Sequence, residues 1–76
     1  MRTRTILQRL GDEVRERRYE RDLSQEGLAH ESELSRNALS KLEQGRSDAR
    51  IQTLFKIALG LKMPLAELIA GVESRQ

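Results

Sequence analysis

Polar side chains of the kinds that bind nucleic-acid bases lie between Ser35 and Gly45. At helical spacing, Ala38, Leu39 and Leu42 form a face suited to a core. The opposite face carries four polar residues: Arg36, Asn37, Ser40 and Lys41. Arginine can hold guanine through two hydrogen bonds, asparagine can pair with adenine in the same way, and lysine reaches guanine or a phosphate. The alternative is an ordinary solvated helix face.

The distribution of charge favours a polyanionic partner, although the net charge of the 76 residues is only +2. Residues 22–33 contain four acidic residues and no lysine or arginine, whereas residues 34–62 contain six basic residues against two acidic ones. Such segregation suits a protein that turns one face toward a polyanion. Charge alone is equally compatible with solvated helix surfaces.

Several chemistries have no support in the sequence. There is no cysteine, no serine–histidine–aspartate arrangement and no glycine-rich loop for phosphates, so we expect no catalysis and no cofactor. His30 has no partner histidine or cysteine at metal-ligand spacing, and we interpret it as a surface residue rather than a metal ligand. No signal peptide or membrane-spanning run is recognisable, which predicts a cytoplasmic protein without a membrane partner.

The elements that would position these side chains are all predicted to be helices. A first helix is expected from about Thr5 to Glu20, capped by Thr5. Its apolar stripe is Ile6, Leu10 and Val14. A fourth is expected from about Arg50 to Leu61, with Asp48 as the candidate cap. Its apolar side is Ile51, Leu54, Phe55, Ala58 and Leu61.

The region between these helices has the pattern of two short helices joined by a tight turn. Ser24 and Ser35 are each placed to cap a helix, and only Ser32, Glu33 and Leu34 separate the two elements. Leu28 and Ala29 form the predicted buried face of the second helix, and the glycine within it, Gly27, predicts a close approach by another helix. Gly45 suits the end of the third helix, which we place at residues 35–44.

A fifth helix opens at Pro64, whose fixed backbone angle suits a first turn. Its apolar residues are Leu65, Leu68, Ile69 and Val72. We therefore predict an all-α protein, a compact five-helix bundle containing a helix-turn-helix. Residues 5–72 form the domain, residues 1–4 an N-terminal arm and residues 73–76 a C-terminal tail.

These motifs resemble the phage-repressor and Cro type of helix-turn-helix, the XRE-like transcriptional regulators. The resemblance rests on LSQEGLA, LSRNALSKLEQG, IQTLFKIALGL and PLAEL, and it covers roughly Leu10 to Leu68. The family usually has glycine at the positions of Asp22, Glu33 and Lys62, so the sequence predicts left-handed strain or a different turn there. Small controller proteins of restriction–modification systems also lack the turn glycine at times, so the sequence is compatible with that subgroup of the family.

The resemblance assigns roles to individual residues. Base reading falls on Arg36, Asn37 and Lys41, with Ser40 beside them. Contacts with the DNA backbone fall on Gln25, Ser35, Gln44, Arg46, Ser47 and Arg50. Arg18 and Glu43 occupy positions that form a partly buried ion pair between the first and third helices, a structural role. A lambda-repressor-like domain of this kind implies double-stranded DNA as a partner.

One helix-turn-helix reads few base pairs, so we expect a homodimer bound to a near-palindromic operator. The apolar residues expected at its interface are Leu59, Leu65, Leu68, Ile69 and Val72. The predicted function is a transcriptional regulator, a repressor or an activator, for which RNA polymerase is a candidate partner and no small-molecule effector is evident. The alternative is a protein-interaction module, such as an antitoxin-type partner or a small helical adaptor.

Overall fold

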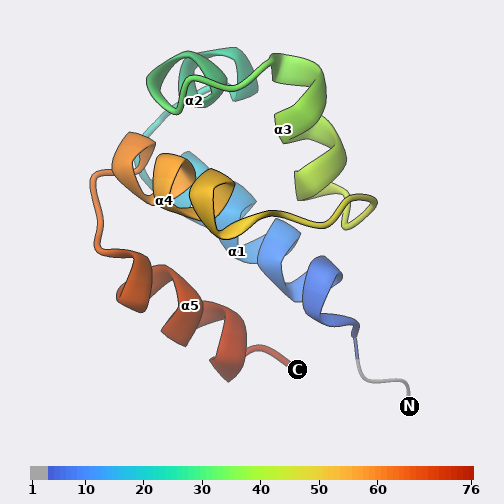
Figure 1. The fold of residues 1–76 in the computed structure, drawn as a ribbon. Coiled ribbons are helices and arrows are strands. Elements are labelled where there is room, and N and C mark those ends of the chain that lie inside the picture. Colours follow the sequence, from blue (N-terminus) through green and yellow to red (C-terminus); the bar gives the residue numbers. More distant parts are fainter. Residues whose placement is uncertain (1–3) are drawn as a thin grey trace.

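The computed structural model describes residues 4–76, and these form five α-helices and no strand (Figure 1). The helices are α1 (Ile6–Glu20), α2 (Gln25–Glu31), α3 (Arg36–Glu43), α4 (Ile51–Gly60) and α5 (Leu65–Ser74). The all-α prediction is confirmed, and each helix lies within about two residues of its predicted position. Residues 1–3 of the predicted N-terminal arm lie outside the described residues, and Arg4 forms an ion pair with Asp12.

Side-chain caps fix the beginnings of the first three helices, as the sequence predicts. The hydroxyl of Thr5 accepts a hydrogen bond from the backbone N–H of Gln8, and the Gln8 side chain accepts one from Thr5 in return. Ser24 and Ser35 accept from the N–H groups of Gly27 and Ala38 at 2.9 and 3.0 Å. Each cap satisfies a donor that the first turn of a helix leaves without a partner.

Four residues in the left-handed conformation end the first four helices. Asp22, Glu33 and Lys62 have φ angles of 56°, 55° and 56°, and Gly45 has a φ of 71°. The chain thus keeps the turn geometry for which glycine is suited, even where an acidic or basic residue occupies the position.

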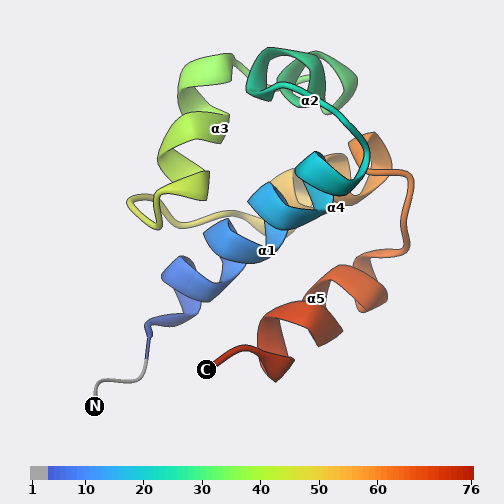
Figure 2. The same cartoon turned by 180° about the vertical axis from the view of Figure 1, so that it is seen from behind.

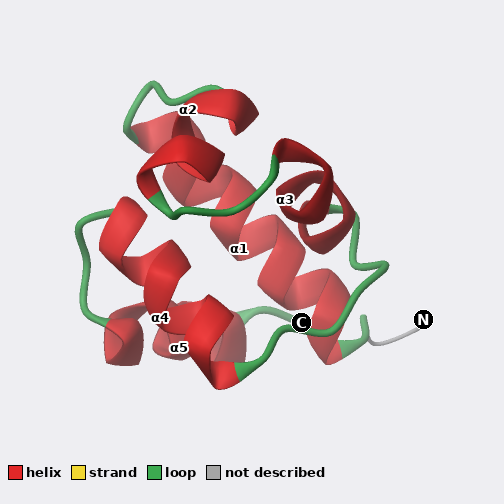
Figure 3. Cartoon of the chain, turned by 45° about the horizontal axis from the view of Figure 1, so that its top comes forward, coloured by secondary structure: helices red, strands yellow, loops and turns green. Residues whose placement is uncertain are grey.

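Helix α1 runs through the middle of the molecule and α5 lies along one side of it. Helix α4 lies between the pair α2 and α3 and helix α5 (Figures 1 and 2). The helix pair α2 and α3 lies at the opposite end from α5 and comes forward when the top is tilted toward the viewer (Figure 3). The core is built from all five helices: Leu10, Val14, Leu28, Ala29, Leu39, Leu42, Ile57, Ala58, Leu61, Leu68 and Val72. No helix among residues 4–76 is both long and apolar enough to cross a bilayer.

Gly11 and Gly60 each permit a close helix crossing, and neither is the glycine that the sequence suggested. A Cβ atom at Gly11 would lie 2.5 Å from the carbonyl oxygen of Glu43, so α1 crosses the end of α3 almost in backbone contact. A Cβ atom at Gly60 would clash with Ser32, next to the turn of the helix-turn-helix. The prediction for Gly27 is wrong, because only Ser24 and Leu23 lie near it.

Several residues predicted to be buried are exposed. Ile6 is 65% exposed, and Ile51 and Phe55 of α4 also face outward. Ala38 is exposed on α3, whose core contacts come from Leu39 and Leu42 alone. Helical spacing correctly placed apolar residues along one side of each helix, but the apolar side extends beyond the part of the helix that the core covers.

The predicted cap of α4 is also corrected. The Asp48 carboxylate accepts a hydrogen bond from the N–H of its neighbour Ala49 at 2.8 Å, and Arg50 is the N-cap residue. No side chain caps α4, so Asp48 stabilises the loop before the helix instead of the helix itself.

The C-terminal segment is packed beyond Val72, where the sequence places the end of the domain. Helix α5 continues to Ser74, and the Arg75 guanidinium reaches back to Glu13 and Glu16 of α1 at 2.8 and 2.7 Å. Arg9 also donates to the carbonyl oxygen of Arg75 at 3.0 Å. The predicted tail of residues 73–76 is therefore joined to the domain through Arg75.

Candidate nucleic-acid interface

The turn that joins α2 and α3 is held by hydrogen bonds from its backbone N–H groups to carbonyl oxygens of α2. The N–H of Ser32 donates to Leu28, and the N–H of Leu34 donates to Ala29, both at 2.8 Å. Glu33, in the left-handed conformation, lies between them with its side chain exposed. The turn therefore has the helix-turn-helix geometry despite its acidic residue.

Helix α3 has two distinct faces. Leu39 and Leu42 are buried in the core, while Arg36, Asn37 and Lys41 are exposed. Within residues 4–76, none of these three polar side chains makes a hydrogen bond or an ion pair. Ser40 is half-buried, and its hydroxyl accepts a hydrogen bond from the Gln44 amide at 3.1 Å. Three of the four predicted base-reading side chains are thus available for a ligand.

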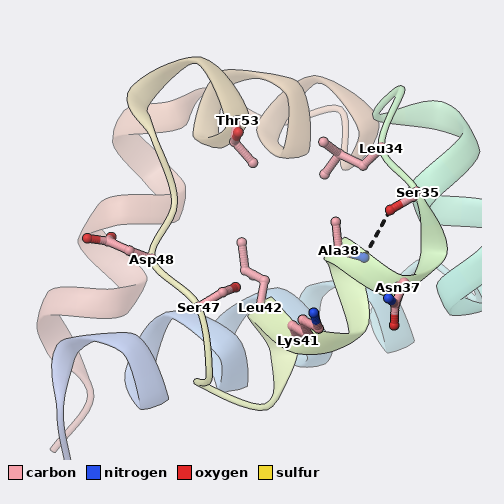
Figure 4. A pocket seen from close by; sticks show the side chains of 9 residues that line it. All are labelled: Leu34, Ser35, Asn37, Ala38, Lys41, Leu42, Ser47, Asp48 and Thr53. Atoms are coloured by element: carbon pink, nitrogen blue, oxygen red, sulfur yellow. Dashed lines mark hydrogen bonds between the residues drawn. The ribbon is translucent and has the colours of Figure 1, made fainter.

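A groove of about 420 Å³ runs between α3, the loop that follows it and α4 (Figure 4). Asn37 and Lys41 border it from α3, Ser47 and Asp48 from the loop, and Thr53 from α4. Leu34, Ser35, Ala38 and Leu42 complete its lining. The groove combines an apolar floor with hydroxyl, amide, ammonium and carboxylate groups at its edge.

A second hollow, of about 330 Å³, lies where the start of α2 meets α3. All of its lining residues are polar: Gln25, Arg36, Asn37 and Ser40. Arg36 is the charged member, so the hollow favours an anionic or hydrogen-bonding ligand. Residues predicted for the DNA backbone and for the bases meet here.

A buried ion pair holds α3 to α1. Arg18 donates from Nε to one carboxylate oxygen of Glu43 at 2.8 Å and from Nη2 to the other at 2.9 Å. Arg18 also donates to the carbonyl oxygen of Leu23, before α2, at 3.0 Å. The hydrogen bonds to Glu43 raise the pKa of the Arg18 guanidinium above its ordinary value. The predicted structural pair is present, and its two-point geometry fixes the orientation of α3.

Gln25 joins this pair, which the sequence did not predict. Its amide nitrogen donates to the Glu43 carboxylate at 3.1 Å, so residues of α1, α2 and α3 meet at one carboxylate. We call Arg18, Gln25 and Glu43 the Glu43 cluster. Helical spacing indicated that Leu28, Leu39 and Leu42 hold α2 and α3 together, but no local pattern pairs a residue at the start of one helix with the end of the next.

The loop after α3 carries the remaining residues predicted for the DNA backbone. Arg46 donates to the Gln44 side chain at 3.1 Å, and Gln44 donates to Ser40, which gives an exposed chain of polar groups. Ser47 is half-buried and Arg50 is exposed at the start of α4. The spacing of Ser40 and Gln44, four residues apart, could have indicated this contact from the sequence.

The predicted dimer residues separate into two groups. Leu59 is 74% exposed, and Leu65 and Ile69 are half-buried. Leu68 and Val72 are buried in the core, although Val72 also lines an apolar hollow with Ile6 and Ile69, so these two residues offer little surface to a second subunit. The exposed apolar residues on α4 are instead Ile51, Phe55 and Leu59, at intervals of four residues.

The chain matches the helix-turn-helix family over residues 14–68, which spans all of α2, α3 and α4. It belongs to this helix-turn-helix family and is a DNA-binding transcriptional regulator. The resemblance to XRE-like regulators is thereby confirmed.

Its relatives include proteins from phage and restriction–modification systems. The chain is 36% identical over 66 residues to the control protein C.MunI from Mycoplasma sp, covering 86% of this chain and 89% of that protein. It is 33% identical over 61 residues to the cryptic phage CTXphi transcriptional repressor RstR from Vibrio cholerae, covering 80% of this chain and 55% of RstR. The restriction–modification controller protein C.AhdI from Aeromonas hydrophila superposes with a TM-score of 0.80 at 34% identity, covering 82% and 94% of the two chains.

Proposed function

We propose that this regulator binds a near-palindromic operator as a homodimer, with α3 of each subunit in the major groove. The observation that carries the proposal is the outer face of α3, where Arg36, Asn37 and Lys41 are exposed and free of side-chain partners within residues 4–76. Side chains with full hydrogen-bonding capacity on a rigid helix are what base-edge recognition requires.

Each polar residue of the interface has a role in this proposal. Arg36, Asn37 and Lys41 read bases, with Ser40 beside them. Phosphates are bound by the residues that surround α3: Gln25, Ser35, Gln44, Arg46, Ser47 and Arg50. Phosphate contacts would fix the register of the protein on DNA, and base contacts would select the sequence.

Substitution of Arg36 and Arg46 tests this division. Arg36→Ala should cost about 1–3 kcal/mol on the operator and relax the preference at one or two base pairs. Arg46→Ala should weaken binding to operator and random DNA alike, and should flatten the salt dependence by about one unit of slope. Fluorescence anisotropy at several salt concentrations, on an inverted repeat found upstream of the gene and on a scrambled duplex, measures both effects.

Two outcomes would contradict the proposal. Equal losses for both variants on specific and random DNA would show that α3 does not read sequence. No binding by the wild-type chain at micromolar concentration would instead favour the protein-interaction alternative.

For the dimer interface we propose the outer face of α4, which the structure suggests in place of the buried residues Leu68 and Val72. Ile51, Phe55 and Leu59 are 63%, 59% and 74% exposed, so three large apolar side chains face solvent along one stripe. Large apolar side chains exposed together mark an interaction surface, and a twofold axis would bury the same stripe on both subunits. The half-buried Leu65 and Ile69 of α5 would flank it.

Sedimentation of a charged variant tests the interface. Leu59→Lys should convert a dimer into a monomer at micromolar concentration and weaken operator binding, while the purified chain keeps its helical circular dichroism. Ala70→Lys is the control, because it adds the same charge at an exposed helix position outside the α4 stripe. A wild-type monomer that still binds the full operator would overturn the dimer proposal.

The similarity to C.MunI and C.AhdI further suggests that the chain controls a restriction–modification system. Occupancy of the operator would then block or recruit RNA polymerase. A transcription assay with purified polymerase and increasing protein, on the promoter upstream of the gene, distinguishes repression from activation.

A further inference from the structure

The carboxylate of Glu43 accepts a third hydrogen bond in addition to the two from Arg18 that join α3 to α1. One of its oxygens accepts from Arg18 Nη2 at 2.9 Å and from Gln25 Nε2 at 3.1 Å, and the other accepts from Arg18 Nε. Its side chain is 1% exposed, whereas Gln25 is half-buried and lines the polar hollow beside Arg36 and Asn37. Gln25 therefore connects a buried charge to the surface where DNA would lie.

The carboxylate also determines which way the Gln25 amide is turned. A carboxylate only accepts hydrogen bonds, so the atom facing Glu43 must be the Gln25 nitrogen. That nitrogen carries a second hydrogen, and a phosphate oxygen is also only an acceptor. The amide oxygen is left to accept from a donor in the hollow, such as the Arg36 guanidinium.

We propose that Glu43 is a positioning residue for DNA binding, which acts by holding the Gln25 amide so that its second N–H points to a backbone phosphate. This inference rests on the proposed function. In the absence of the carboxylate, Gln25 would be free to rotate and to turn over, and DNA would have to immobilise it. Ordering one flexible side chain corresponds to roughly a two- to tenfold change in affinity.

A double-mutant cycle on operator affinity separates this role from a purely structural one. Glu43→Gln keeps the shape of the side chain but removes the charge, and it should weaken binding by about two- to tenfold. If Glu43 acts in part through Gln25, then Glu43→Gln should cause a smaller loss in a Gln25→Ala background than in the wild type. If Glu43 only orients α3, the same loss should appear with and without Gln25.

Arg46 provides the matched control, because it is proposed to bind phosphate and makes no contact with Glu43. The effects of Glu43→Gln and Arg46→Ala should therefore multiply, in contrast to those of Glu43→Gln and Gln25→Ala. Glu43→Asp is a second variant, which keeps the negative charge and shortens the side chain, and it should show the same coupling. Thermal unfolding of each variant, followed by circular dichroism, establishes that it is folded at the assay temperature.

Operator affinity can also be measured with a neutral methylphosphonate in place of one backbone phosphate at a time. A change in the orientation of α3 alone would not make one such phosphate depend on Gln25. One substituted phosphate should weaken the wild-type complex, make no difference to Gln25→Ala and have a reduced effect on Glu43→Asp. Multiplicative effects of Gln25 and Glu43, with operator binding intact, would overturn the positioning role and leave the proposed function standing. A wild-type chain that binds no DNA would overturn both.

Discussion

Two buried carboxylates, Glu43 and Glu13, each accept bonds from side chains of other segments, but in different parts of the molecule. Glu43 receives Arg18 from α1 and Gln25 from α2, and it lies at the end of α3. Glu13 of α1 receives Arg17 from its own helix and Arg75 from beyond α5, and we call these three residues the Glu13 cluster. A Cβ atom at Gly71 would clash with the Glu13 carboxylate, so α5 packs directly against this charge.

The two clusters differ in how completely they are enclosed. The side chains of Arg18 and Glu43 are 7% and 1% exposed, whereas Arg75 is 23% exposed and shares its charge with the exposed Glu16. An ion pair removed from water depends on its partner far more than one that water can still reach. The comparison indicates that the Glu43 cluster sets the geometry of the DNA-binding half, and that the Glu13 cluster fastens the end of α5.

Removal of Arg18 should have the largest effect. Arg18→Met leaves Glu43 buried without its ion-pair partner, which should lower the free energy of unfolding by about 3–5 kcal/mol, as measured by urea denaturation. The double variant Arg18→Met with Glu43→Leu should recover much of this loss, because no charge is then buried unpaired. A single variant within 1 kcal/mol of the wild type would show that the pair does not hold α3.

Removal of Arg75 should have a smaller effect. Arg75→Ala leaves Glu13 with Arg17 and opens it to water, so we expect a loss of about 1–2 kcal/mol in the same denaturation assay. Arg21→Ala, which removes an exposed arginine next to α1, is the control and should change little. A loss as large as that of Arg18→Met would remove the distinction between the two clusters.

The Glu13 cluster should also make stability sensitive to acid. Burial alone would raise the pKa of Glu13, but hydrogen bonds from Arg17 and Arg75 outweigh it and lower the pKa below the ordinary 4.5. The stabilisation is therefore complete above that ordinary value and is lost as pH falls through the lower, folded-state pKa.

Glu13→Gln should consequently lower stability at neutral pH and make the decline below pH 4.5 less steep, as followed by denaturation at stepped pH. An unchanged decline in Glu13→Gln would mean that other carboxylates govern the acid sensitivity.

The smallest change in stability should come from two turn residues in the left-handed conformation, Glu33 after α2 and Lys62 after α4. Glu33→Gly and Lys62→Gly should each stabilise the chain by about 0.5–1 kcal/mol, since the strain relieved exceeds the added entropy of the unfolded chain. Equal gains are expected because the strain is local to each backbone residue. Arg21→Gly, where φ is negative, should destabilise instead, and thermal unfolding compares all three.

Most of the fold followed from local signals, and the errors in predicted burial share one physical cause. Thr5, Ser24, Ser35 and Gly45 marked helix boundaries because caps act through neighbouring residues. Phe55, Ala38 and Val72 were assigned to the wrong environment because apolar character does not say which partner covers it.

In the interface, the family resemblance predicted the ion pair between Arg18 and Glu43, whereas the contact of Gln25 with this pair became visible only in the structure. Gln25 could not be placed against Glu43 from the sequence, because 18 residues separate them and their meeting depends on how α1, α2 and α3 pack. The same holds for Arg75, which lies 62 residues from Glu13.

The outer face of α3 has an evolutionary consequence. Arg36, Asn37 and Lys41 are exposed and make no side-chain bond within residues 4–76, so the fold places no demand on their identity. Exchanges at such positions usually alter stability by less than about 0.5 kcal/mol. If these residues read bases as proposed, new operators can be reached by changing these positions alone, while Leu39, Leu42 and Glu43 on the inner face keep the fold unchanged.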